Sequence, residues 1–163
     1  MPGGGWVMVS NSETIAPLGG GVRAIRFDAT GAIESATRVL GGTNVNCAGG
    51  PTPWGTWLSC EEYDLGDAVA PVLPGFPFGP GVAGMVWECD PTGATPGTAL
   101  PALGVFSHEA VAADPVTNAV YLTEDNVRVS STDSAPPRRT SAVGPICRVA
   151  SSKQPWSRHL PRC

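Results

Sequence analysis

Charged side chains are sparse in this sequence, and basic ones are nearly absent from its first 126 residues. Charged residues make up 15% of the 163 residues. Before Val127 the only basic residues are Arg23, Arg26 and Arg38, against thirteen acidic ones, a balance of minus ten. An acidic region of this kind argues against nucleic-acid binding and is compatible with the binding of metal cations.

Long hydrophobic runs are missing as well. No apolar segment approaches the roughly 18 residues of a membrane-spanning helix, so no membrane insertion is predicted. The first residues contain neither the basic segment nor the apolar segment of an export signal. We therefore expect either an intracellular protein or a chain whose natural beginning lies upstream of Met1.

The cysteines show no CxxC spacing, which argues against a zinc ribbon. There are five of them: Cys47, Cys60, Cys89, Cys147 and Cys163. An odd number also fits poorly with a complete disulfide framework, although a single Cys60–Cys89 bridge is left open. The GxSxG and Walker A patterns are missing too, so neither a serine hydrolase nor a P-loop enzyme is indicated.

Glycine and proline are abundant instead, with 21 and 17 residues, which favours a loop-rich β protein. Strands are predicted over Trp6–Ser10, Val22–Phe27, Ala32–Leu40, Trp54–Leu58, Gly84–Cys89, Val105–Ala112 and Ala119–Thr123. Related turns containing Asp and Thr are predicted over Asp28–Gly31, Asp90–Gly93 and Asp114–Asn118. Repeated antiparallel hairpins predict an all-β fold, as a partial β-propeller with an incomplete ring. A β-sandwich fits the pattern almost as well.

The composition changes at Val127, so we expect residues 1–126 to form the β region and residues 127–163 a basic tail rich in Ser, Arg and Pro. The tail carries seven basic residues against Asp133 alone. Irregular or disordered structure is predicted for it, and a surface loop for Leu65–Val82. A sharper hypothesis is that the tail is out-of-frame sequence. An intact reading frame at the genomic locus would contradict that hypothesis.

One stretch, Asn46–Glu62, concentrates groups that bind metals. Cys47 stands at the start of a predicted Gly/Pro loop, and the carboxylates of Glu61 and Glu62 follow the next predicted strand. Further candidate ligands lie at other strand ends: His108, Glu109, Glu124 and Asp125. Carboxylates suit Ca²⁺, Mg²⁺ or ferric iron, whereas a thiolate selects a transition metal. The mixed set predicts a metal centre with more than one kind of ion.

Each of these residues also has a purely structural interpretation. Cys47 taken alone is typical of a small buried residue. Adjacent carboxylates, such as Glu61 and Glu62, are typical of solvated strand ends. His108 taken alone is typical of a hydrogen-bonded structural histidine. Trp54 and Trp57 are typical of packing. A second catalytic hypothesis pairs Cys47 as nucleophile with His108 as base. The neighbouring carboxylates would raise the pKa of the thiol and oppose that chemistry.

Three motifs together resemble the PhoX family of bacterial alkaline phosphatases. The first runs from Asn46-Cys-Ala-Gly-Gly to Ser59-Cys-Glu-Glu62. The second is Ser107-His-Glu-Ala-Val-Ala112, and the third is Val120-Tyr-Leu-Thr-Glu-Asp125. The resemblance covers Gly4 to Asn126. It implies a β-propeller with a mixed iron–calcium cluster on its axis and the hydrolysis of phosphate monoesters.

The resemblance also implies roles for individual residues. Cys47 corresponds to the iron-binding cysteine, and the remaining positions of the motifs correspond to metal-facing residues: Glu61, Glu62, His108, Glu109, Glu124 and Asp125. Asn11 and Glu13 match a weaker Asn-x-Glu pattern. In the implied mechanism, clustered cations neutralise the phosphate oxygens and promote in-line attack on phosphorus.

Members of the family are longer than this chain, and exported members carry a twin-arginine signal that is not seen here. We therefore expect a fragment whose cluster lacks the ligands of later blades, which argues against activity of this chain on its own. The alternative is a non-catalytic propeller fragment, or a binding module without bound metal.

Overall fold

A computed structural model describes residues 4–14, 19–62, 84–126, 140–143 and 147–148. These residues form an all-β structure of three antiparallel sheets, together with one short 3₁₀ helix, η1 (Pro101–Leu103). Within the described part of the chain, no helix has the length and apolar character needed to cross a membrane. The all-β prediction is therefore confirmed.

The first two sheets are simple meanders, in which each strand pairs with the next along the chain. The first sheet contains β1 (Trp6–Ser12), β2 (Gly20–Phe27) and β3 (Ile33–Thr43). The second sheet contains β4 (Asn46–Pro51), β5 (Trp57–Glu61), β6 (Val86–Cys89) and β7 (Thr98–Ala99). The turns between β2 and β3 and between β4 and β5 are short and contain glycine, whereas residues 62–85 separate β5 from β6.

The third sheet is built around β9 (Ala119–Asn126). On one side β9 pairs with β8 (His108–Ala113), and on the other with β10 (Thr140–Val143) and β11 (Cys147–Arg148). Two segments of the predicted tail thus add to the sheet, so the tail is not irregular throughout. The remainder of the tail lies outside the described residues, and so does the loop predicted over Leu65–Val82.

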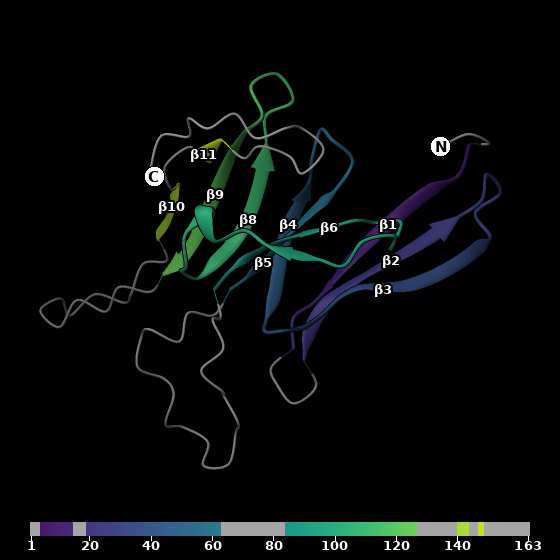
Figure 1. The fold of residues 1–163 in the computed structure, drawn as a ribbon, viewed down its shortest axis with the longest axis horizontal. Helices are drawn as coiled ribbons and strands as arrows, with labels where there is room; N and C mark the ends of the chain where they lie inside the picture. Colours follow the sequence, from purple (N-terminus) through teal and green to yellow (C-terminus); the bar gives the residue numbers. More distant parts are fainter. Residues whose placement is uncertain (1–3, 15–18, 63–83, 127–139, 144–146, 149–163) are drawn as a thin grey trace, which may run out of the picture.

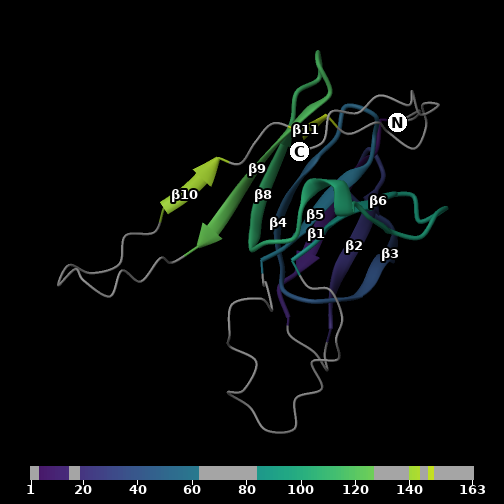
Figure 2. The ribbon, with the colours of Figure 1, turned by 60° about the vertical axis from the view of Figure 1, so that its left-hand side comes forward.

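The second sheet lies between the other two, as Figures 1 and 2 show from two directions. Its strand β4 contacts β8 on one side and both β1 and β2 on the other. Each junction encloses a hydrophobic core. The core between the second and third sheets contains Leu58, Cys60, Val86, Leu103, Val111, Val120 and Leu122. The core between the first and second contains Val22, Ala24, Val39, Leu40 and Cys89.

Strand alternation explains why one sheet serves two cores. Successive side chains of a strand point to opposite faces, so Leu58 and Cys60 join one core while Trp57, which directly precedes Leu58, packs against the other. Burying a side chain such as Leu58 contributes roughly 1.5–3 kcal/mol. The same alternation excludes the Cys60–Cys89 bridge, because the two thiols belong to different cores and both are free.

The predicted Asp turns are present and share one mechanism. Asp28 accepts hydrogen bonds from the backbone N–H of Thr30 at 2.8 Å and from its hydroxyl at 2.7 Å. Asp90 does the same for Thr92, at 2.8 and 2.7 Å. Asp114 accepts from the backbone N–H of Val116 at 2.8 Å. These turns connect β2 to β3, β6 to β7, and β8 to β9, so they do not occupy equivalent positions in the three sheets.

The prediction of a strand over Trp54–Leu58 is wrong at its N-terminal boundary, because β5 begins at Trp57. Residues 52–56 form the turn between β4 and β5, closed by hydrogen bonds between Thr52 and Thr56. Cys47 accordingly lies within β4 and not in a Gly/Pro loop. The glycines of β4 leave room for the neighbouring backbone. A Cβ at Gly49, for example, would lie only 2.0 Å from the carbonyl oxygen of Leu58.

Candidate metal centre

The β4–β5 hairpin places the thiol and the carboxylate of the first motif at the same end. Asn46 pairs with Glu61 across the hairpin, and the backbone N–H of Glu62 donates to the carbonyl oxygen of Val45 at 3.0 Å. Cys47 and Glu62 therefore become neighbours. The loop predicted at Cys47 and the strand predicted after it would instead have placed the two groups at opposite ends of one segment.

Two further carboxylates reach Glu62 from the third sheet. Glu109 lies in β8, at an irregularity in the pairing between His108 and Val111, and Asp125 lies near the end of β9. One carboxylate oxygen from each of Glu62, Glu109 and Asp125 lies within 4.8 Å of the other two. Three carboxylates at this separation provide the hard oxygen ligands that Ca²⁺ prefers.

The first sheet completes the arrangement with Glu13, which directly follows β1. The ligand atoms of Glu13, Cys47 and Glu62 also lie within 4.8 Å of one another. Glu62 thus belongs to both groups. We call the five residues the Glu62 cluster: Glu13, Cys47, Glu62, Glu109 and Asp125.

Burial and the negative charges of the Glu62 cluster raise the pKa values of its members Cys47 and Glu62. The pKa of the Cys47 thiol is raised to about 12 by burial, by its hydrogen bond to Glu62, and by the charges of Glu62, Glu13 and Glu109. Burial also raises the pKa of Glu62, as do the charges of Glu13, Glu109 and Asp125, while the hydrogen bond from Cys47 lowers it. Bound cations would reverse the sign of this field and favour the thiolate.

A hydrogen-bond network behind Cys47 fixes its position. The side-chain amide of Asn11 donates to the carbonyl oxygens of Cys47 at 3.2 Å and Ala48 at 2.8 Å. Its side-chain oxygen accepts from Trp57 Nε1 at 3.0 Å and from the Ser59 hydroxyl at 3.2 Å. All four bonding positions of the amide are used. Asn11 therefore ties β1 to both strands of the hairpin that carries the thiol.

Three predicted metal ligands lie outside the Glu62 cluster. Glu61 is 1% exposed, and its two oxygens accept hydrogen bonds from the backbone N–H groups of Asn44 at 2.8 Å and Met85 at 3.0 Å. This carboxylate holds two chain segments together. Glu124 lies opposite His108 in the β8–β9 pairing, and neither residue belongs to the two close groups.

His108 is fully buried, and its ring packs against Phe106 with a centroid separation of 3.6 Å. Its Nε2 lies 3.4 Å from the carbonyl oxygen of Gly104, whereas Nδ1 has no hydrogen-bond partner among the described residues. Burial lowers its pKa to about 4, so the ring is neutral at pH 7. No hydrogen bond joins it to Cys47 within the described structure, so the predicted nucleophile–base pair is not formed.

Both tryptophans of the first motif serve packing, as their structural interpretation predicted. Trp54 Nε1 donates to Glu88 at 2.7 Å, and Trp57 Nε1 donates to Asn11. Glu13 is the one member of the Glu62 cluster that was not among the predicted metal ligands. Its signal was the short pattern Asn11-x-Glu13. In the structure Asn11 donates to the backbone carbonyl oxygen of Cys47, and Glu13 lies close to the thiol.

The fold and the Glu62 cluster define an all-β protein that gathers a thiol and four carboxylates from three sheets. Comparison with known families gives the particular identification: the family described as Alkaline phosphatase PhoX matches residues 20–134, and the chain belongs to this family. The match continues past Asn126, where the resemblance was expected to end. No curated protein and no solved structure gave a significant match.

Proposed function

We propose that this chain carries part of the metal centre of a phosphatase that hydrolyses phosphate monoesters, with iron and calcium as its ions. Membership of the PhoX family indicates a phosphatase-like function. The observation that supports the finer proposal is the Glu62 cluster, in which a thiol and four carboxylates from separate strands approach within 4.8 Å in two groups sharing Glu62.

The residues of the Glu62 cluster fit the two kinds of ion. Cys47 offers the soft sulfur ligand that selects a transition metal such as iron, and Glu62, Glu109 and Asp125 offer the oxygens that calcium prefers. The charges that act on Cys47 and Glu62 are all negative. Cations at this position would therefore relieve a repulsion that the fold otherwise maintains.

The chain's own residues hold and orient this centre. When bound, the ions would polarise the phosphoryl group and supply the positive field that attracts an anionic substrate. Glu62 lies in both groups and links them. Asn11 fixes the backbone of Cys47, and Glu61 fixes the segment that precedes Glu62 by bonding to Asn44 and Met85.

For the fold we propose three successive blades of a β-propeller. In support, the three sheets stack face to face, and their first strands are neighbours: β1 contacts β4, and β4 contacts β8. The Glu62 cluster draws its residues from these first strands and the segments beside them, where the axis of a propeller would run. A crystal structure in which β4 did not lie between β1 and β8 would contradict this arrangement.

The proposed function is tested by loading the purified chain with iron and calcium and measuring metal content by elemental analysis. Hydrolysis of a chromogenic phosphate monoester is followed in parallel. We expect iron to be retained by the wild type and lost from Cys47→Ser. A folded wild-type chain that retains no iron would support the alternative, a non-catalytic fragment without metal.

The measurement of phosphate-monoester hydrolysis distinguishes a centre that is active in this chain from one that only binds metal. Turnover that depends on Cys47 would show that the ligands present in this chain suffice for catalysis. Retained iron without turnover would show that the centre forms here and that groups outside the chain complete it.

A further inference from the structure

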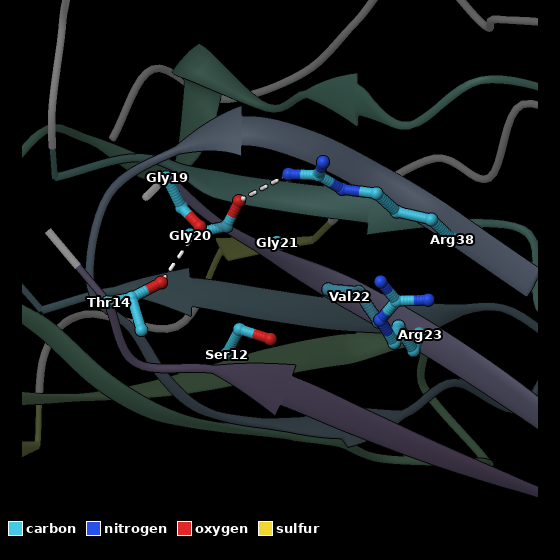
Figure 3. A pocket seen from close by; sticks show the side chains of 8 residues that line it. All are labelled: Ser12, Thr14, Gly19, Gly20, Gly21, Val22, Arg23 and Arg38. Atoms are coloured by element: carbon cyan, nitrogen blue, oxygen red, sulfur yellow. Dashed lines mark hydrogen bonds between the residues drawn. The ribbon is translucent and has the colours of Figure 1, made fainter. Parts of the chain in front are cut away.

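A pocket of about 220 Å³ lies at the junction of the three strands of the first sheet. Figure 3 shows its lining side chains around one hollow. The lining residues are Ser12, Thr14, Gly19, Gly20, Gly21, Val22, Arg23 and Arg38. None of these described lining residues is acidic, although the chain up to Asn126 is strongly acidic overall.

The two arginines of this pocket are direct neighbours across the sheet. Arg23 of β2 pairs with Arg38 of β3, and both side chains are exposed. Like charges directly opposite each other on neighbouring strands are destabilising. Arg23 and Arg38 are also two of only three basic residues before Val127. Two of these three basic residues thus repel each other across the sheet, and such an arrangement indicates a ligand of opposite charge.

Arg38 is held in place by hydrogen bonds to the backbone. Its Nε donates to the carbonyl oxygen of Leu40 at 3.2 Å, and one Nη donates to the carbonyl oxygen of Gly20 at 3.3 Å. The guanidinium lies directly over Gly41, where a Cβ would approach its Cζ to 2.5 Å. Fixing a long side chain beforehand reduces the entropy lost when a ligand binds.

Hydroxyl groups supply further polar atoms around the same hollow. Thr14 Oγ1 donates to the carbonyl oxygen of Gly19 at 2.8 Å, which ties the two sides of the pocket together, as Figure 3 shows. Ser12 contributes a second hydroxyl to the lining. The proton of the Thr14 hydroxyl is already donated to Gly19. The two guanidinium groups and the Ser12 hydroxyl remain as donors of the kind that bind the oxygens of phosphate-type anions.

We propose that this pocket binds a small oxyanion of the phosphate class, in a site separate from the Glu62 cluster. Glu13 of the cluster lies between Ser12 and Thr14 in sequence, so the two sites adjoin through the end of β1. The proposal does not rest on the proposed phosphatase function. The anion can be inorganic phosphate or the phosphate group of an ester, and separate titrations distinguish these sources.

The test uses the full chain after removal of metals with a chelator, so that bound cations cannot attract the anion. Inorganic phosphate is titrated by calorimetry in a phosphate-free buffer, and phenyl phosphate is titrated separately. We expect saturable binding that is weakened about tenfold or more in Arg23→Gln and in Arg38→Gln, because each loses charge-assisted hydrogen bonds.

Two variants separate a built site from general charge attraction. Arg26→Gln removes the same charge from the same strand, outside the pocket lining, and we expect binding within about twofold of wild type. Gly41→Ala keeps every charge but displaces the Arg38 guanidinium, so binding should weaken. Circular dichroism checks the fold of each variant. Because the Arg23 side chain is exposed, we expect its substitution to disturb the fold least.

The proposal is overturned if phosphate does not bind in a saturable way, or if Arg26→Gln weakens binding as much as Arg23→Gln does. Unchanged affinity in Arg23→Gln would overturn it as well. Binding of inorganic phosphate alone would identify the free anion as the ligand, whereas tighter binding of phenyl phosphate would identify an ester. Either result supports the site.

Discussion

The Glu62 cluster and the arginine pocket adjoin at the end of β1 but have opposite charge and different construction. The cluster collects a thiol and carboxylates from three sheets, whereas the pocket is built within one sheet. Both hold like charges close together, at a cost to the stability of the protein without bound counter-ions. Such local conflicts are typical of functional sites, because stability there is subordinate to binding.

The largest expected effect is on metal binding at the Glu62 cluster, the proposed metal centre. Glu62→Gln removes the one carboxylate common to both close groups. We expect the affinity for both iron and calcium to fall by about a hundredfold or more, since even outer-shell changes cost 10–100-fold. Equilibrium dialysis with elemental analysis measures this. Glu34→Gln, an exposed change on β3, serves as control, and equal losses in both variants would contradict the role of Glu62.

A second expectation concerns the hydrogen-bond network by which Asn11 ties β1 to the β4–β5 hairpin. Asn11→Leu leaves Trp57 Nε1 and the Ser59 hydroxyl without their acceptor. We expect a loss of about 2–3 kcal/mol in the free energy of unfolding, measured by urea denaturation. Ser10→Ala on the neighbouring position of β1 should change it by less than about 0.5 kcal/mol. Similar values for both variants would show that the Asn11 network does not hold the hairpin.

The reactivity of Cys47 reports the field of the Glu62 cluster directly. Because its pKa is raised to about 12, little thiolate exists at pH 8, and alkylation of Cys47 in metal-free protein should be slow and rise with pH. Glu62→Gln removes a hydrogen bond and a charge that raise this pKa. Alkylation should then accelerate about tenfold for each unit by which the pKa falls. Peptide mass spectrometry isolates the rate at Cys47, and an unchanged rate would contradict the electrostatic coupling.

The stability of metal-free protein should also respond to pH through Glu62. Its pKa is raised in the folded state, so the unfolded chain loses this proton at a lower pH than the folded chain does. Stability is therefore lost as pH rises from the unfolded pKa through the folded one. We expect Glu62→Gln to be more stable than wild type at pH 7 and the difference to shrink on acidification. Thermal denaturation across pH measures it, and a difference that grows towards low pH would refute the sign.

The smallest effect is expected at the arginine pair. In low-salt buffer without phosphate, Arg23→Gln removes the repulsion from Arg38 and should stabilise the protein by a few tenths of a kcal/mol. The gain should disappear at high salt, because exposed charges are screened, and should reverse when phosphate saturates the wild type. Chemical denaturation under the three conditions tests this. A destabilised variant in low salt would show that the pair does not repel.

The local features of the chain were largely predictable. Alternation placed most strands within a few residues of their observed bounds, and the Asp–Thr turns were recognised from residues whose side chains bond their own backbone. The errors fell where local pattern is ambiguous. A Gly/Pro loop was predicted to begin at Cys47, yet residues 46–51 form β4, where the glycines permit close strand contacts that a Cβ would prevent.

The candidate site was predictable in type but only partly in membership. Glu61 and Glu62 are adjacent in sequence, but strand alternation sends one carboxylate to backbone N–H groups and the other to the cluster. His108 and Glu109 divide in a similar way, the ring entering the core beside Phe106. Which of two neighbouring residues faces the site depends on register and on bulges, and neither is visible in a single sequence.

The sequence by itself determined the all-β class, the family and the kinds of ligand, because strand periodicity, turn residues and long motifs are local properties. Only the tertiary structure decided that Cys47 and Glu62 meet at one end of a hairpin, that Glu13 joins them, and that Arg23 faces Arg38. The register of neighbouring strands fixes the first and third of these contacts, and the packing of the first sheet against the second brings in Glu13.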